Sequence, residues 1–550
     1  MGIENIMNIA ATGINVNRLA IEVTSENIAN VNTDGYSRQR TILETGPTTS
    51  ANGFPLGSGV KLAAVQRSYD GLLQLQLVNN TSTYNQSLSR QTALQQLEPL
   101  FNELTSDGLN DAMQQFFNAW QDLSVNPQGI PERQAVLTRA QILVDNFQQV
   151  STGLTDTQKS VNDMLTGITA DISAKAKNIA SLNSQIVQAE QSGANANELR
   201  DQRDLLIRQL SEDVGVSYYE EQDGTVSVSL PGGEELVTGY LYRTVYPSSA
   251  ATSAIMITPL GNPPPSSDSG TGTNITATVG GSNNSLGKIG GILEVRDSVI
   301  PGYLDKLNEL ANAVAREVNT LHRAGYGLNG STGTDLFAMS STTVTGTTSG
   351  SSNVISNIDT TGLSVGMTVS GPGIPAGTLI TGTPNSSPPS AANSITLSAA
   401  TTSANTNANY NFSGVNSSTL AVAITDLNDL AASSTDPASS GGGAGNNENA
   451  LSIAQIWETS LTFSSGSTSL GGFYNSFTST VGVDLQSVKN EVSQGEAFLR
   501  QLDNLRESNS GVSLDEELTN LIKYQRAFQG CSKVLNTATE MLDIVLDMVR

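Results

Sequence analysis

Few residues of this sequence could carry catalytic chemistry. His322 is the only histidine and Cys531 the only cysteine among 550 residues. A Ser-His-Asp triad would have to use His322, and no nucleophile-elbow sequence accompanies it. One histidine and one cysteine cannot build a zinc site either. His322 lies in a helical run before a Gly-rich turn, which predicts a packing or capping role, and Cys531 lies on an apolar helical stripe, where a thiol behaves as a small hydrophobe.

Two other stretches resemble chemical sites only superficially. The sequence "GSNNSLGK" at 281–288 suggests a phosphate-binding loop, but it has one residue too many and continues with Ile289 instead of Ser or Thr. The acidic run at 515–517 is accounted for by the preference of helix N-termini for negative charge. The sequence therefore predicts no catalytic residue, no cofactor and no metal site, and a protein that is not an enzyme.

Charge and composition exclude further classes of function. The net charge is -24, with 27 basic against 51 acidic residues, so nucleic acid and anionic membranes should be repelled. No apolar run approaches the ~18 residues that would span a bilayer, which predicts no membrane insertion. The first residues lack the basic and apolar segments of a cleaved secretory signal. We therefore expect a protein that is cytosolic or is exported by a route that needs no such signal.

Both ends of the chain carry an apolar stripe with coiled-coil spacing. The N-terminal stripe repeats every seven residues: Met7, Ile14, Ile21 and Ile28. The C-terminal stripe follows alternating steps of three and four residues: Leu521, Tyr524, Phe528, Cys531, Leu535, Ala538, Leu542, Val545 and Val549. Such stripes need a partner, so we predict that the two helices pair. Ser513 with Glu516 predicts a capping box at the start of the second helix. Because most chains fray at their ends, two terminal stripes indicate an interface seam in a polymer.

The middle of the chain alternates between helical and β patterns. Longer helical tracts, which could form one bundle, are predicted at 68–104, 131–191, 301–324 and 481–505. In the second tract, only Gln158 and Lys175 interrupt the apolar heptad. Period-two alternation at 214–246, with a hairpin turn at Asp223 and Gly224, predicts strands. The Ser/Thr/Gly-rich segment 340–414 predicts a turn-rich β domain, with disorder as the alternative, and 439–447 a flexible link.

The expected fold is mainly α with β insertions: terminal coiled-coil helices, an elongated helical bundle and inserted β-rich domains, nested in one chain. The outer layers are built from both halves of the sequence. The expected division is a terminal domain of 1–60 with 509–550, a bundle of 61–213 with 286–335 and 446–508, a β-rich domain of 214–285, and a β insert with its link at 336–445.

A dense turn and charge signal follows the first helix, in "SENIANVNTDGYSRQR" at 25–40. Asn30, Asn32, Asp34 and Gly35 should stop the helix, since such residues bond locally to the backbone or tolerate turn geometry. The segment that follows should then be extended. Its arginines are natural partners for carboxylates on this acidic chain.

This stretch resembles the N-terminal motif of bacterial flagellar axial proteins, the family of rod, hook and hook-associated proteins. Its continuation "GYSRQ" resembles the hook-associated members in particular. The residues that match the motif are Asn27, Asn30, Asn32, Gly35, Tyr36 and Arg38. Long stretches at 116–140, 199–230, 290–330 and 507–549 are similar to the same family. Asn446, where the family often has Asp, departs from its pattern, and the segment 340–414 resembles no common part of the family.

The resemblance implies a structural component of the flagellum that forms the junction zone between hook and filament and is required for filament assembly. It implies helical self-assembly, and contacts with hook protein and with a neighbouring hook-associated protein or flagellin. It also implies secretion through the flagellar type III channel with a dedicated export chaperone. Two alternatives remain: another axial protein of the flagellin type, or a surface adhesin or glycan-acting protein that functions through the insert.

Overall fold

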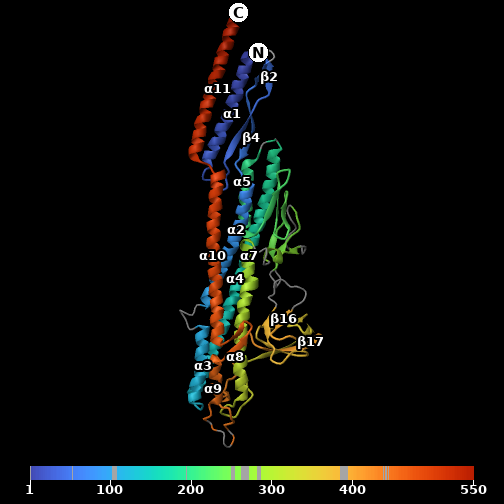
Figure 1. Ribbon diagram of the computed structural model, residues 1–550, viewed down its shortest axis with the longest axis vertical. Helices are drawn as coiled ribbons and strands as arrows, with labels where there is room; N and C mark the ends of the chain where they lie inside the picture. Colours follow the sequence, from blue (N-terminus) through green and yellow to red (C-terminus); the bar gives the residue numbers. More distant parts are fainter. Residues whose placement is uncertain are drawn as a thin grey trace.

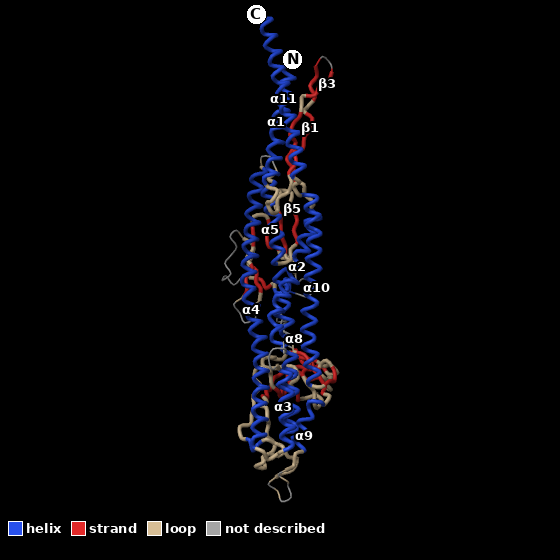
Figure 2. Tube along the Cα trace, turned by 90° about the vertical axis from the view of Figure 1, so that its left-hand side faces the viewer, coloured by secondary structure: helices blue, strands red, loops and turns tan. Residues whose placement is uncertain are grey.

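The computed structural model of the chain is a long rod with both termini at the same end (Figure 1). It describes residues 2–549 except for 52–53, 102–107, 192, 194, 249–253, 262–271, 281–285, 384–393, 438, 440–442 and 444. Helices run along the rod, and small sheets lie along its side (Figure 2). None of the described helices is long and apolar enough to cross a membrane.

The end of the rod that holds both termini is built from two helices and a β ribbon. Helix α1 (Gly2–Ala29) and helix α11 (Leu514–Val549) lie side by side and run in opposite directions. The ribbon pairs β1 (Gln39–Thr45) with β4 (Val60–Arg67), and its tip pairs β2 (Thr48–Ala51) with β3 (Phe54–Gly57). The predicted pairing of the two terminal helices is thus confirmed. Ser513 and Glu516 do not act as the predicted capping box, since the Glu516 carboxylate accepts from Arg38 instead.

The body of the rod is a bundle around one continuous apolar core. Its longest member is α4, whose 61 residues span about 90 Å at 1.5 Å per residue. The bundle helices are α2 (Gly71–Leu97), α3 (Leu109–Val125), α4 (Ile130–Glu190), α5 (Asn197–Asp213), α7 (Gly287–Glu294), α8 (Ile300–Ala324), α9 (Glu448–Gln455) and α10 (Leu470–Ser510). Short pieces complete it: η1 (Glu98–Phe101), the π-helix η3 (Val295–Val299), η4 (Leu427–Asp429), η5 (Ile456–Glu458), β18 (Leu461–Phe463) and β19 (Gly466–Thr468).

The polar interruptions of the α4 heptad have specific partners. Gln158 Nε2 donates to the carbonyl of Arg296, in the π-helical turn between α7 and α8. Lys175 forms an ion pair with the buried carboxylate of Asp213 at the end of α5. The helical tract predicted at 481–505 starts too late, because α10 begins at Leu470. Ser469 caps the helix there by accepting from the N–H of Gly472. The glycines of that first turn weaken the helical signal in the sequence.

Three further sheets pack beside the bundle. A four-stranded sheet has the order β5 (Ser217–Glu220), β6 (Val226–Ser229), β7 (Glu235–Thr238) and β8 (Leu241–Tyr242). Next to it lie β9 (Val245–Pro247), β10 (Ile255–Ile257) and β11 (Thr273–Asn274), followed by the short helix α6 (Thr276–Gly280). The insert is a six-stranded sheet, whose strands are β12 (Ser340–Ser349), β13 (Val354–Ser356), β14 (Thr368–Ser370), β15 (Ile380–Gly382), β16 (Ser394–Leu397) and β17 (Ala404–Gly414). The predicted β structure is therefore confirmed, and the nested domain boundaries remain a proposal.

The insert has its own apolar core and is fixed to the middle of α8. Asn312 Nδ2 donates to the carbonyls of Val365 and Val415, and its Oδ1 accepts from the N–H of Val415. Two turns earlier, the Asp305 carboxylate accepts from the hydroxyl of Thr383. Burial and the nearby charge of Glu309 raise the pKa of Asp305 to about 6, although the Thr383 bond opposes this. The insert thus rests on a carboxyl group that is costly to ionise.

This buried carboxyl group predicts a pH-dependent stability. A folded-state pKa of about 6, against 3.8, means that the folded chain holds the proton more tightly than the unfolded chain. Its stabilising effect is therefore present below about pH 4 and is lost as the pH rises through 6. We expect Asp305→Asn to raise the free energy of unfolding by about 2 kcal/mol at pH 7 and to change it little at pH 4. Urea denaturation at both pH values measures this.

The matched control is Asp359→Asn, which removes an exposed carboxylate from the same insert. It should give no such gain at pH 7. Equal effects of Asp305→Asn at pH 4 and pH 7 would show that folding does not raise the pKa of Asp305.

Candidate assembly site at the foot of the terminal helices

The motif that follows α1 lies where the terminal helices meet the bundle. Asn27, in the last turn of α1, is almost fully buried. Its Nδ2 donates to the carbonyl of Gln39 on β1 and to Oε2 of Glu517 on α11, at 2.9 and 3.0 Å. Its Oδ1 accepts from the Gln39 N–H and from the Tyr36 hydroxyl, both at 2.9 Å. One amide thereby joins three elements and leaves none of its own hydrogen-bonding groups unpaired.

Arg38 ties the same turn to the start of α11. Its Nη1 lies 2.6 Å from Glu516 Oε2, and its Nη2 lies 2.6 Å from Glu517 Oε1. The Glu517 side chain is only 3% exposed, so this pair is shielded from water, whereas Glu516 is largely solvated. Burial alone would lower the pKa of Arg38, but the two carboxylates outweigh it and raise the pKa. The Arg38 N–H also donates to the carbonyl of Ser510, the last residue of α10.

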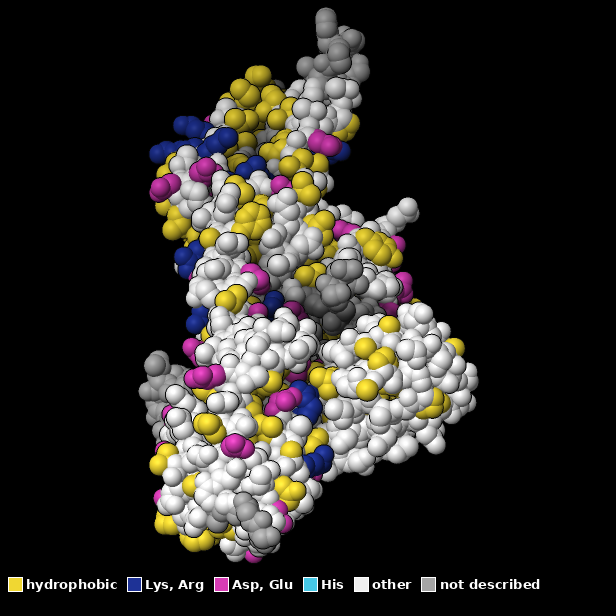
Figure 3. Space-filling model, turned by 60° about the horizontal axis from the view of Figure 1, so that its bottom comes forward, with side chains coloured by type: hydrophobic (Ala, Val, Ile, Leu, Met, Phe, Trp, Pro, Cys, Tyr) yellow, Lys and Arg dark blue, Asp and Glu magenta, His cyan; other side chains and the backbone are white. Residues whose placement is uncertain are grey.

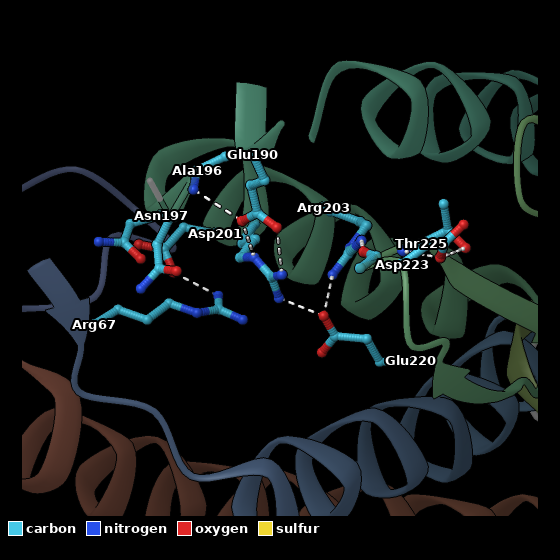
Figure 4. A network of polar contacts seen from close by, with 12 residues as sticks. Arg67, Glu190, Ala196, Asn197, Asp201, Arg203, Glu220, Asp223 and Thr225 are labelled. Atoms are coloured by element: carbon cyan, nitrogen blue, oxygen red, sulfur yellow. Dashed lines mark hydrogen bonds and ion pairs between the residues drawn. The ribbon is translucent and has the colours of Figure 1, made fainter. Parts of the chain in front are cut away.

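A second arginine fixes the β ribbon to the bundle (Figure 4). Arg67, at the end of β4, contacts the carboxylates of Asp201 and Asp204 on α5 at 2.8 and 2.6 Å. Asp201 also accepts from the backbone N–H of Ser37 at 2.8 Å. Burial raises the pKa of both carboxyl groups, and the charge of Arg67 opposes that rise. This ion triad therefore needs all of its members, because a buried carboxylate that lost Arg67 would be uncompensated.

The charge network continues along the top of the bundle. Arg200 binds Glu190 at the end of α4 through two nitrogens, at 2.8 and 2.9 Å, and also pairs with Glu220 of β5. Arg203 is buried on the next turn and donates to the carbonyl of Gly224 and to Asn183 Oδ1. Figure 4 shows Glu190, Arg203 and Glu220 between Arg67 on one side and Asp223 and Thr225 on the other. The joint between terminal helices and bundle is thus held by specific polar contacts.

The turn itself requires its glycine. Gly35 has φ +80°, and an added Cβ would lie 3.1 Å from the Leu205 side chain of α5. Asn30 closes the end of α1 by donating to the carbonyl of Glu26 and accepting from the Thr33 hydroxyl. Asn32 is exposed at the tip of the turn. The predicted helix stop and the carboxylate partners of Arg38 are confirmed, and the role of the motif in assembly remains a proposal.

The apolar stripe of α11 does not pack directly on the predicted apolar stripe of α1. The α11 stripe faces α1, with Leu521, Phe528, Leu535 and Leu542 each partly buried. The buried line on α1 consists instead mostly of small and polar residues, with one valine: Ala10, Gly13, Val16, Ala20, Thr24 and Asn27. The predicted residues Met7, Ile14, Ile21 and Ile28 lie at the edge of this line and are only half-buried. The helices can approach closely because Gly13 meets Cys531, where an added Cβ would lie 2.7 Å from Sγ.

Helix α11 exposes much of its apolar surface and extends past the start of α1. Asn27 contacts Glu517 and Gly13 faces Cys531, so the same 14-residue step on both helices sets the register. Beyond about residue 543, α11 has no counterpart on α1, and Figure 1 shows its end projecting. Val545 is accordingly 44% exposed, and the side chain of Val549 lies outside the described part. The other large exposed apolar residues on α11 are Leu514, Leu518, Ile522, Val534, Met541, Ile544, Leu546 and Met548.

The residues considered for catalysis or phosphate binding, His322 and Lys288, are bonded to other parts of the fold. His322 is buried; its Nδ1 lies 2.8 Å from the carbonyl of Thr334, and its Nε2 accepts from the N–H of Ala431 at 3.0 Å. These contacts define a neutral ring, in accord with its lowered pKa, for which burial is the main cause. Lys288, at the end of the loop-like stretch 281–288, pairs with Asp213, and residues 281–285 lie outside the described part. No group of three His, Cys, Asp or Glu side chains in the described residues could hold a metal ion.

Comparison with known proteins finds flagellar relatives along the whole chain. The family described as "Flagellar hook-associated protein FlgK helical domain" matches residues 94–337. "Flagella basal body rod protein" matches 7–36, and "Flagellar basal body rod FlgEFG protein C-terminal" matches 506–548. Flagellar hook-associated protein 1 of Escherichia coli K12 is 29% identical over 99% of this chain and all of its own length. The Bacillus subtilis strain 168 protein of the same name is 28% identical, over 100% of this chain and 98% of its own.

A solved structure shares the fold. The flagellar hook junction protein FlgK from Burkholderia pseudomallei aligns with a TM-score of 0.60 and 19% identity, over 79% of this chain and all of that one. The terminal helix pair, the axial motif and the nested bundle define the class: bacterial flagellar axial proteins. Within this class, the chain is similar over its full length to flagellar hook-associated protein 1 of several bacteria.

The paired ends predict a specific effect of Arg38. Arg38→Gln would leave the nearly buried Glu517 carboxylate without its cation, which costs on the order of 3 kcal/mol. We expect α1 and α11 to exchange their amide hydrogens much faster in this variant, while the bundle keeps its protection. Hydrogen exchange of the purified chain, followed by mass spectrometry, measures both.

The control is Arg18→Gln, which breaks an exposed i,i+4 pair with Glu22. Such pairs contribute only ~0.5 kcal/mol, so protection should stay close to that of the unchanged chain. Similar protection of α11 in both variants would contradict the role assigned to Arg38.

Proposed function

We propose that this chain is a structural protein of the bacterial flagellum that builds the junction between hook and filament. Copies of the chain assemble side by side, with the terminal helices as the inner layer and the bundle and sheets outside it. Hook protein lies on one side of this zone, and filament protein or a neighbouring hook-associated protein on the other. The zone gives the filament the surface on which it assembles.

The observation that carries this proposal is that α11 has apolar side chains on more than one of its faces. One side packs on α1, yet apolar residues such as Met541, Ile544 and Met548 remain on other sides, with exposures of 50, 61 and 74%. A helix that is apolar on several faces is normally surrounded by protein. In one isolated copy these side chains face water, and an assembly of many copies covers them. The polymer seam that we proposed from the sequence is therefore wider than one stripe.

Secretion and handling before assembly belong to the same proposal. The chain is exported through the flagellar type III channel, and a dedicated chaperone covers its apolar terminal helices in the cytosol. The exposed apolar residues on α11 are the surface that needs such cover. A flagellin-like role is the second candidate, because the six-stranded insert projects sideways from the rod (Figure 1). The number of copies per flagellum separates the two: few in a junction, and many in a filament.

Charge on the outer side of α11 should block assembly while the single copy keeps its fold. Met541→Asp and Ile544→Asp introduce carboxylates at positions that are exposed in one copy and covered in the assembly. Burying such a charge costs several kcal/mol per copy. We expect hooks without filaments, with filament subunits released into the medium, and an unchanged melting curve of the purified variant. Electron microscopy of cells and circular dichroism measure these outcomes.

Thr537→Asp is the control, since Thr537 is an exposed polar residue one turn away. This variant should be tolerated better than either apolar replacement. Normal filaments in cells that carry Met541→Asp and Ile544→Asp together would overturn the assignment of α11 to the inner layer.

A further inference from the structure

Unpaired cations gather on one side of α11. Lys523, Arg526 and Lys533, called here the basic face, are all exposed, and none forms an ion pair within the described part of the chain. Arg526 lies two positions from both Tyr524 and Phe528, which face α1, so it points away from α1. Lys533 stands in the same relation to Cys531 and Leu535. Figure 3 shows a group of Lys and Arg side chains at the upper left, where the terminal helices lie.

Such a face is unusual for this chain. Acidic residues outnumber basic ones by 51 to 27, and most arginines and lysines are paired with a neighbouring carboxylate. Three cations that lack a partner on one face therefore indicate a partner outside the single copy. The surface of a second copy, with its net charge of -24, is a source of the required negative charge.

A complementary group of carboxylates lies near the foot of α1, a few residues from the level of Lys523. Glu22, Glu26 and the α5 residue Glu198, called here the acidic face, lie near the foot of that helix. The carboxyl groups of Glu26 and Glu198 are within hydrogen-bonding reach of each other, and burial and this like charge raise the pKa of Glu26. Glu22 lies two positions from the buried Ala20 and Thr24, so it points away from α11. Its described partner is the exposed Arg18, a solvated pair of small energy.

The register of the helix pair gives the relative heights of these two faces. Since Asn27 meets Glu517 and Gly13 meets Cys531, Glu22 lies level with about residue 522 and Glu26 with about residue 518. By the same register Lys523 is level with about residue 21 and Arg526 with about residue 18, on the opposite side of the helix pair and four to five residues, roughly 6–8 Å, along the axis from Glu22 and Glu26. Copies placed side by side with an axial offset of roughly 7 Å would bring Lys523 and Arg526 of one copy level with Glu26 and Glu22 of the next.

We propose that the basic face of one copy binds the acidic face of a neighbouring copy and thereby sets the lateral spacing and height of adjacent copies. This inference rests on the proposed assembly function. The contact joins two different surfaces, so it is head-to-tail and generates a ring or a helix instead of a closed dimer. Its charges favour this pairing over two like faces, and it fixes which side of each copy meets the next.

Charge reversal tests this contact. Lys523→Glu with Arg526→Glu reverses the basic face, and Glu22→Lys with Glu26→Lys reverses the acidic face. Each pair of substitutions creates like-charge contacts between copies, so we expect at least a tenfold drop in the fraction of cells with filaments. The chain that carries all four substitutions has both faces exchanged and should recover most of that loss. Each purified variant should keep the melting curve of the unchanged chain, because the residues replaced are at least partly exposed.

Lys177→Glu serves as the control, since it reverses an exposed cation on the bundle helix α4, outside both faces. It should leave filament number unchanged. Normal filaments in either charge-reversed variant would overturn the proposed contact, and loss without recovery in the fourfold variant would overturn the second copy as its partner. The proposed function is tested separately by labelling the unchanged chain in isolated flagella: label away from the hook–filament boundary would reject that function itself.

Discussion

The two ends of this chain are joined through one small group of polar side chains. Asn27 and Arg38 bring the end of α1, the start of β1 and the start of α11 together, with Glu517 as the shared acceptor. These contacts are shielded from water, so each depends on the others. They give α1 and α11 a common register, and every later feature of the terminal helices follows from that register. The exposed outer faces of α11 and the projecting end of that helix are two such features.

The joint with the bundle uses the same physical principle. Arg67 holds two carboxylates of α5, and one of these also accepts from the backbone beside Arg38. Removing apolar surface from water stabilises the bundle itself, but that effect is non-directional and does not fix the orientation of one element on another. The polar network fixes this orientation, because its buried charges are paired in only one arrangement of the elements. A rod built from separate layers therefore presents its terminal helices at a defined angle to the bundle, as side-by-side packing of many copies requires.

The helical bundle shows how polar residues inside a heptad are used. Gln158 donates to the carbonyl of Arg296 in the π-helical turn, and Lys175 neutralises Asp213. Both residues reduce the apolar character of α4, and each also fixes the height of a neighbouring element. The same holds for Asn312, which binds the insert to α8 through backbone groups. Specific docking is thus carried by single buried amides and charges, and the surrounding apolar core supplies most of the stability.

The sequence alone determined the long helices, the stop after α1 and the pairing of the ends, because apolar periodicity and turn residues are local signals. It did not predict the shorter helices α3, α5, α7 and α9. It also determined the kind of partner that Arg38 needs, since an arginine in an acidic chain binds carboxylates. The tertiary structure decided which carboxylates these are, because Glu516 and Glu517 lie almost 480 positions away. It also placed the small residues of α1, in preference to its isoleucines, against α11. That choice depends on how closely two helices approach at Gly13, which no local pattern encodes.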